Sequence, residues 1–489
     1  MSETNSYKQI IKATSIFGGT QFVGIITGVV RSKLVAIFLG PAGMGIVGLL
    51  TSTIELIGNL TNFGLRTSAV KSVATAYALG DQEQIAIEVT VLRRLVWITG
   101  LLGMVITILL SPWLSQITFG SHEYTYGFIW ISITLLFNQL TSGQDAVLQG
   151  MRQLKYLSLS SIYGSVLGLF LVIPTYYFMG PKGIVPVIII TSSLIMLLTW
   201  YFANKTKLLV VSVTTEQTWY RGKEMLRMGF LISLSALLTT AASYLLRIFI
   251  SNFGTVADVG LYSAGFAIIG TYVGMIFSAM GTDYYPRLSG VSNDIIQTNK
   301  LINQQAEIAL LILGPVLAIF MTFSGWAVQL LYSSKFLAVT SMIVWASLGM
   351  YFKASSWPMA FIFLAKSDSK MFFLNEIIVN SYGLLLNILG YYYFGLEGLG
   401  VSFLLMYFFY FIQISVVCKK KYAFVFDLKF VKILLKQFGI GFGCFLINRY
   451  MVDFYSYFYG VLGCLFAIGV SLKELDKVFD LKSFIRKSK

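Results

Sequence analysis

Four basic side chains lie inside stretches of the sequence that are otherwise apolar, and they are the first candidates for chemistry. Arg31 and Lys33 come late in the first stretch, Arg247 comes late in the seventh, and Lys353 lies midway along the tenth. A cation at the centre of a membrane helix costs about 3 kcal/mol. Snorkelling to the outer interface or structural pairing are the alternatives. The set predicts a cationic cavity that holds an anionic head group.

Three acidic residues lie in stretches of the same kind: Glu55, Asp145 and Glu376. Each can pair with one of the cations or carry a coupling proton, and both interpretations stay open. Asp283 and Arg287 stand four residues apart at the end of a stretch. That spacing is more typical of an interfacial ion pair on one helix face.

The composition excludes several classes of protein. The chain has 489 residues, of which 56% are hydrophobic and only 12% charged, whereas a soluble domain carries about a quarter charged residues. The net charge of +15 invites a nucleic-acid interpretation, but the basic residues sit at the ends of apolar stretches, so no nucleic-acid partner is expected. The single histidine and three dispersed cysteines predict neither a metal site nor a disulfide set. Since nucleotide-binding and metalloprotease motifs are missing, no cofactor and no enzyme activity are expected.

The apolar stretches predict an all-α integral membrane protein of about fourteen helices, because a bilayer cannot satisfy an open backbone. The predicted helices are 10–38, 43–65, 92–111, 127–150, 155–178, 183–203, 226–250, 258–283, 306–332, 338–364, 370–394, 398–417, 433–448 and 455–471.

Basic residues divide unevenly between the two sides of this arrangement. The N-terminal tail and every second junction carry 29 of the 36, up to the tail from Arg486 to Lys489. The opposite junctions carry three, Lys182, Lys335 and Arg449. By the positive-inside rule, both termini are predicted to be cytoplasmic.

Two halves of the chain match at an offset of 214 or 215 residues. The landmarks are a basic residue seven positions before a glycine, a lysine 25 positions before a glycine, and a tryptophan. The matches pair Lys33 and Gly40 with Arg247 and Gly254, Lys155 and Gly180 with Lys370 and Gly395, and Trp130 with Trp345. Each unit holds six helices, an even number, so the repeats are parallel. Transporters built this way place the substrate between the halves.

The repeat predicts three parts of the chain. Residues 1–210 form an N-terminal lobe of six helices, and 211–425 form the matching C-terminal lobe. Residues 426–489 hold an appended helix pair and a basic cytoplasmic tail.

Three segments resemble the motifs of Wzx-type flippases, a family of the multidrug/oligosaccharidyl-lipid/polysaccharide exporter (MOP) superfamily. They run from Lys33 to Gly45, from Val259 to Ser289 with Tyr285-Pro286-Arg287, and from Lys335 through Lys353 to Glu376. The resemblance implies a MATE-like fold of two six-helix lobes around a cationic cavity. It also implies export of undecaprenyl-diphosphate-linked oligosaccharides across the bacterial inner membrane for O-antigen or other surface polysaccharides. Lys33, Arg247 and Lys353 fall on basic positions of that pattern, and Glu376 on an acidic one.

The leading hypothesis is therefore a flippase for a lipid-linked saccharide, working by alternating access. Its partners are this substrate, the surrounding membrane lipids and components of a polysaccharide polymerase. The alternative is a drug or metabolite antiporter of the same superfamily. Antiporters of cationic drugs favour acidic cavities, whereas the residues here predict a basic one. A membrane-embedded polymerase or ligase is a third hypothesis, but it would normally need a large outer loop, and none is found in the sequence.

Overall fold

The structure, a computed structural model, describes residues 3–206, 208–209, 211–270, 274–451 and 453–479, and its regular elements there are all helical. Nine helical segments in these ranges are long and apolar enough to cross a membrane. The predicted all-α membrane fold is confirmed. The basic tail from Arg486 to Lys489 lies outside the described residues.

The nine segments differ from the fourteen predicted helices because some helices run together and others are divided. Three segments each hold two predicted helices, namely α1 (Glu3–Thr61), Leu154–Ala203 and α14 (Ser369–Tyr422). Predicted helix 127–150 is divided into α4 (Thr125–Ile131) and α5 (Ile133–Gly150). Predicted helix 258–283 falls partly outside the described residues. The count of fourteen therefore stays a prediction.

The chain forms two compact units, and the first comprises Met1–Gly260. Besides α1, α4 and α5, it contains α2 (Leu65–Leu79), α3 (Gln82–Phe119), α6 (Leu154–Met179), η1 (Gly180–Gly183), α7 (Ile184–Ala203), α8 (Thr215–Phe253) and the start of α9 (Val256–Ile268). α6 packs on both α1 and α7, and α3 packs on α5. Apolar side chains of α1 and α3 to α7 form one of its buried cores, around Leu50, Phe128 and Val172.

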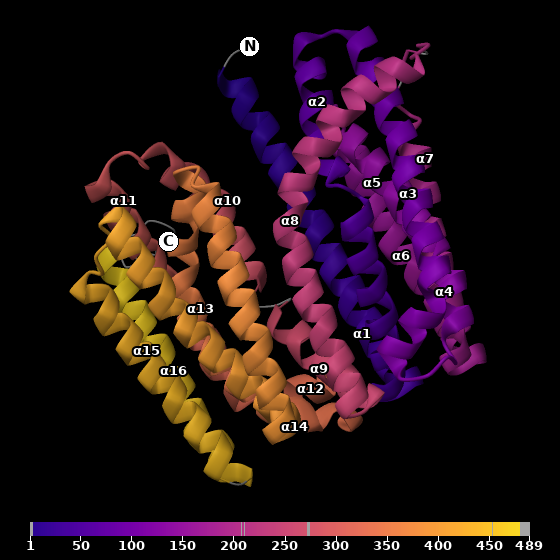
Figure 1. The fold of residues 1–489 in the computed structure, drawn as a ribbon. Helices are drawn as coiled ribbons and strands as arrows, with labels where there is room; N and C mark the ends of the chain where they lie inside the picture. The colour runs from indigo at the N-terminus through magenta and orange to yellow at the C-terminus, as the bar shows by residue number, and fades with distance from the viewer. Residues whose placement is uncertain (1–2, 207, 210, 271–273, 452, 480–489) are drawn as a thin grey trace. The chain divides into compact units, whose positions relative to one another are not determined.

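The first unit includes α8, which runs alongside α1 in Figure 1 and also packs on α2 and α3. α8 begins well before the predicted residue 226, because Thr214 and Gln217 form a capping box with hydrogen bonds of 3.1 and 3.2 Å. Gly64 and Gly229 touch backbone to backbone, so a side chain at either would overlap the other segment. Packing thus places the unit boundary after Gly260 rather than at 210, while the repeat-based lobes stay a prediction.

The second unit comprises Leu261–Lys489. It contains the end of α9, α10 (Gly274–Gly290), α11 (Ile295–Thr322), α12 (Ser324–Leu331), η3 (Ser334–Val339), α13 (Thr340–Ala365), α14, α15 (Leu428–Tyr450) and α16 (Asp453–Phe479). α13 packs along α14, and α11 packs on α13, α15 and α16. The predicted ion pair between Asp283 and Arg287 is confirmed on α10, at 3.1 Å, while its place at the membrane interface stays a prediction.

α14 is a helical hairpin whose two arms are joined by a turn at one end and by polar contacts at the other. The arms join at Gly395, which has φ 58° and ψ −141°. At the open end, the Asp368 carboxylate accepts hydrogen bonds from Lys421 and, at 2.6 Å, from the Tyr422 hydroxyl. The bond from Lys421, followed by that from Tyr422, lowers the pKa of Asp368 to about 2. The carboxylate therefore stays ionised and keeps the hairpin closed at physiological pH.

The glycine at the start of the η1 turn repeats this bend in the first unit. Gly180 has φ 54° and ψ −135°, within a few degrees of Gly395, its partner in the predicted repeat. Side chains disfavour this region of backbone space strongly. The first predicted glycine pair does not share one conformation, since Gly40 has φ 66° and Gly254 has φ −117°. The repeat is therefore reproduced in local geometry at one of its two turns.

The appended helices α15 and α16 belong to the second unit and lie side by side (Figure 1). The Glu397 carboxylate of α14 accepts hydrogen bonds from Trp345 at 2.8 Å and from Arg449 at 2.6 Å. Within the pair, the Gln437 amide donates to the Ser471 hydroxyl at 2.8 Å. These polar contacts attach α15 to α13 and α14, and α16 to α15.

Candidate functional site

Lys353 is a half-buried cation held between aromatic rings in the second unit. Its Nζ lies 5.1 Å from the centre of the Tyr407 ring of α14 and 5.8 Å from that of Phe277 of α10. Rings at this distance stabilise an ammonium group by about 0.5–2 kcal/mol without neutralising it. Among the described residues no ion pair to Lys353 is found. Its charge is therefore available to an anionic ligand.

The aromatic side of this site continues into a polar network inside the α14 hairpin. Tyr407 packs edge-on against Tyr410, with ring centres 6.3 Å apart. The Asn375 amide donates to the Tyr410 hydroxyl at 3.2 Å and accepts from Gln413 at 2.8 Å. These bonds fix the two arms in register, so the network positions Tyr407 and, through it, the Lys353 ammonium.

Glu376 lies next to this network on the first arm of α14. Asn380 donates to its backbone oxygen at 2.8 Å and to its carboxylate at 3.4 Å. In the part of the chain that the structure describes, Glu376 forms no ion pair with Lys353 or another cation. The nearby Tyr382 hydroxyl is buried, and no hydrogen-bond partner for it is found among described residues. Glu376 therefore stays a candidate for coupling rather than a component of a formed salt bridge.

The other three predicted cations lie in the first unit. Arg31 is exposed on α1, and Lys33 is half-buried two residues further along. Arg247, on the neighbouring helix α8, is half-buried and donates to the Ser243 hydroxyl at 3.0 Å. The Tyr244 hydroxyl bonds Thr118 of α3 at 2.7 Å and fixes this part of α8. The predicted cationic set thus divides between the units, three residues in one and Lys353 in the other.

The two remaining acids of the first unit have different surroundings. Glu55 is exposed on α1, and the described residues include no ion-pair partner for it. Asp145 of α5 forms an ion pair at 3.4 Å with Arg66 of α2. Both line a polar cavity of about 240 Å³ together with Ser158 of α6. The pairing interpretation of Asp145 is therefore supported, with a cation outside the predicted set.

Sequence reasoning missed Arg66, Tyr407 and Asn375 as neighbours of the predicted residues. Arg66 counts as one basic residue of an inner junction, and nothing in its spacing indicates that α2 turns back towards α5. Tyr407 lies in a run of aromatic residues without helical periodicity. Asn375 could have been identified from the sequence, because it is adjacent to Glu376 in the segment that resembles the flippase motif.

The helical fold and its long apolar spans define the class: a multi-pass helical membrane protein. Residues 34–341 match the family described as polysaccharide biosynthesis protein, and the chain belongs to that family. The lipid III flippase of Escherichia coli K12 is 21% identical over 386 residues, which are 75% of this chain and 88% of that protein. Stage V sporulation protein B of Bacillus subtilis is 25% identical over 177 residues, or 36% of this chain and 34% of that protein.

Solved structures of the MOP superfamily share the fold. The lipid II flippase MurJ in an inward closed conformation gives a TM-score of 0.68 at 14% identity, over 96% of this chain and 99% of that chain. A multidrug resistance MATE family transporter in its inward-facing conformation gives 0.66 at 16% identity, over 82% and 94%. The resemblance to the MOP superfamily drawn from the sequence is confirmed, and the chain is a multi-pass membrane protein.

Proposed function

We propose that this chain is a flippase that moves an undecaprenyl-diphosphate-linked oligosaccharide from the cytoplasmic to the periplasmic leaflet. The observation that carries the proposal is Lys353, a half-buried ammonium between two aromatic rings with no carboxylate paired to it among the described residues. The similarity to a lipid III flippase supports a lipid-linked substrate. The family description supports a role in polysaccharide biosynthesis, and we propose that the product is O-antigen or another surface polysaccharide.

The chemistry of the substrate explains why such cations are useful. A diphosphate that leaves water needs charge-assisted hydrogen bonds, and Lys353, Arg247, Lys33 and Arg31 can donate them. The saccharide needs a polar path, whereas the polyprenyl chain can stay in lipid. Rocking of two lobes would expose the bound head group to one leaflet and then to the other. In this scheme Glu376 and Glu55 are candidates for binding a coupling ion. Both termini lie in the cytoplasm, and components of a polysaccharide polymerase are partners that receive the exported saccharide.

The aromatic rings both hold the Lys353 ammonium in place and favour a substrate of negative charge. A ring face attracts a cation and repels an anion, so Tyr407 and Phe277 keep the Lys353 ammonium in place while its remaining donors stay free to reach a phosphate. A carboxylate partner would instead compete with the diphosphate for the same donors. The arrangement therefore suits an anionic substrate better than the cationic drug of the antiporter alternative.

Export by single variants tests the proposal. In cells that depend on this chain for a surface polysaccharide, Lys353→Ala should abolish most export, because one charge-assisted bond contributes about 2 kcal/mol, or roughly 30-fold. Lys353→Arg should retain more export than Lys353→Ala. Lys370→Ala, at an exposed lysine on α14, is the matched control and should export normally.

Membrane abundance of each variant has to be measured alongside export, so that loss of protein is not mistaken for loss of transport. Normal export by Lys353→Ala at normal abundance would refute the cationic mechanism. Efflux of a cationic drug that survives the same substitution would favour the antiporter.

A further inference from the structure

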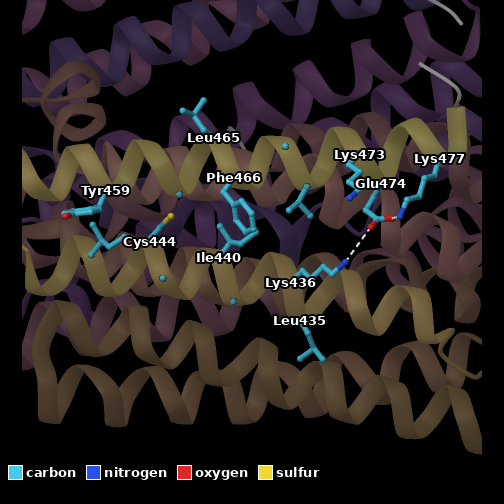
Figure 2. A pocket seen from close by; sticks show the side chains of 16 residues that line it. Leu435, Lys436, Ile440, Cys444, Tyr459, Leu465, Phe466, Lys473, Glu474 and Lys477 are labelled. Carbon is cyan, nitrogen blue, oxygen red and sulfur yellow. Dashed lines mark hydrogen bonds and ion pairs between the residues drawn. The ribbon is translucent and has the colours of Figure 1, made fainter. Parts of the chain in front are cut away.

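A long groove of about 1010 Å³ runs between α15 and α16, and none of the residues assigned to transport lines it (Figure 2). On α15 its lining extends from Leu435 to Ile447, a length of about 18 Å at the helical rise of 1.5 Å per residue. Ile440 and Phe466 lie in its middle part. The groove is therefore an elongated, largely apolar channel on the second unit.

Glycines keep the groove open. A β-carbon added at Gly439, Gly443 or Gly469 would meet no atom within 4 Å. Glycines of the same two helices that face the rest of the unit behave differently, since a β-carbon at Gly441 would overlap Tyr351 and one at Gly460 would overlap Thr322. A fourth lining glycine, Gly463, serves packing, since a β-carbon there would overlap the Cys444 sulfur, but Gly439, Gly443 and Gly469 leave space for another molecule.

One end of the groove is positively charged. Lys436, Lys473 and Lys477 gather there around a single carboxylate, Glu474, as Figure 2 shows. Glu474 pairs with Lys477 at 2.9 Å and with Lys436 at 3.7 Å. Three ammonium groups against one carboxylate leave an excess of positive charge. The opposite end, near Tyr459 and Cys444, has no charged lining residue among those described.

We propose that this groove binds an anionic membrane phospholipid, with the phosphate at the three lysines and an acyl chain along the glycines. Clusters of basic residues between membrane helices are suited to anionic head groups. The groove length of about 18 Å corresponds to roughly one leaflet, half of a hydrocarbon core of about 30 Å. An undecaprenyl chain is far longer than this groove. The lysine end is the one that the positive-inside rule assigns to the cytoplasm, so the lipid belongs to the inner leaflet.

The lining of this groove shares no residue with the proposed transport site, and the inference does not depend on the transported substrate. Lipid binding therefore needs a binding assay rather than an export assay. The purified full chain in detergent is titrated with phosphatidylglycerol and, in parallel, with phosphatidylcholine, and bound lipid is counted by native mass spectrometry. We expect phosphatidylglycerol to bind at least tenfold more tightly than phosphatidylcholine.

Charge removal tests the head-group end. The triple variant Lys436→Gln, Lys473→Gln and Lys477→Gln should lose this preference, because each lysine near an anionic head group contributes about fivefold in affinity. Lys432→Gln is the matched control, at an exposed lysine of α15 that does not line the groove, and should bind as the unmodified chain does.

Filling the groove tests the acyl-chain end without changing charge. Gly443→Leu and Gly469→Leu each place a side chain where the structure has empty space, so the fold should tolerate them while phosphatidylglycerol binding falls at least tenfold. Val461→Leu adds bulk to an exposed position of α16 outside the groove and should leave binding unchanged.

Three results would overturn the inference. The first is equal binding of the two lipids to the unmodified chain, and the second is unchanged phosphatidylglycerol binding in the lysine and glycine variants. The third is displacement of phosphatidylglycerol by substoichiometric undecaprenyl phosphate, which would assign the groove to a polyprenyl carrier. Loss of export in Lys353→Ala bears on none of these, so the two proposals fail separately.

Discussion

The ion pair between Asp145 and Arg66 offers a sharp test of whether an acid inside the first unit is structural or couples an ion. The atoms lie 3.4 Å apart, and the side chains are 18% and 51% exposed. Because Arg66 is half exposed, water screens the pair, and we expect a coupling energy of about 1 kcal/mol. Removing one partner of a fully buried ion pair would instead destabilise a protein by about 3–5 kcal/mol.

Thermal unfolding in detergent of Asp145→Asn, Arg66→Gln and the double variant forms a double-mutant cycle. If the pair is structural, each single variant is destabilised by about 1 kcal/mol, and the double variant is destabilised no more than either. Export should persist in all three at normal abundance. The exposed pair of Asp283 and Arg287, with side chains 74% and 57% exposed, is the matched control and should show weaker coupling.

Two outcomes would refute this assignment. Additive destabilisation would mean that the two side chains do not interact. A stable Asp145→Asn variant that no longer exports would show that the carboxylate serves transport, and the coupling interpretation would then apply to Asp145 after all.

Two further predictions concern the repeat and the topology. Gly395→Ala should destabilise the protein by about 1–3 kcal/mol through backbone strain alone, since φ there is 58° and a β-carbon meets nothing within 4 Å. Gly28→Ala, inside helix α1 and also with nothing within 4 Å of the β-carbon, should be neutral or slightly stabilising in thermal unfolding, and equal effects would contradict the assignment of strain. Reporter fusions at Lys489 and in the loop at His122 should report opposite sides of the membrane, because 29 basic residues against three set the orientation; the same side for both would overturn the charge map.

Local properties of the sequence determined the membrane class and much of the layout. Membrane spans follow from the length and apolarity of each stretch, and the positions of α6, α7 and α13 to α16 were predictable in this way. The helix α2 was not, because its residues lie in a predicted junction. The Gly180 and Gly395 turns were predictable because their conformation depends on the absence of a side chain. The Asp283 and Arg287 pair was predictable because four residues form one turn of one helix.

Only the tertiary structure decided which helices pack together and which charges meet. That α8 packs in the first unit depends on the contact of Gly64 with Gly229, two residues from distant helices. Asp145 pairs with Arg66, and Lys353 contacts Tyr407, and in both cases the two residues lie on different helices. The spacing of residues in the sequence does not predict these contacts, because each contact depends on the rotation and tilt at which two helices pack. The identities of the candidate cations were thus readable from the sequence, and their partners only from the packed structure.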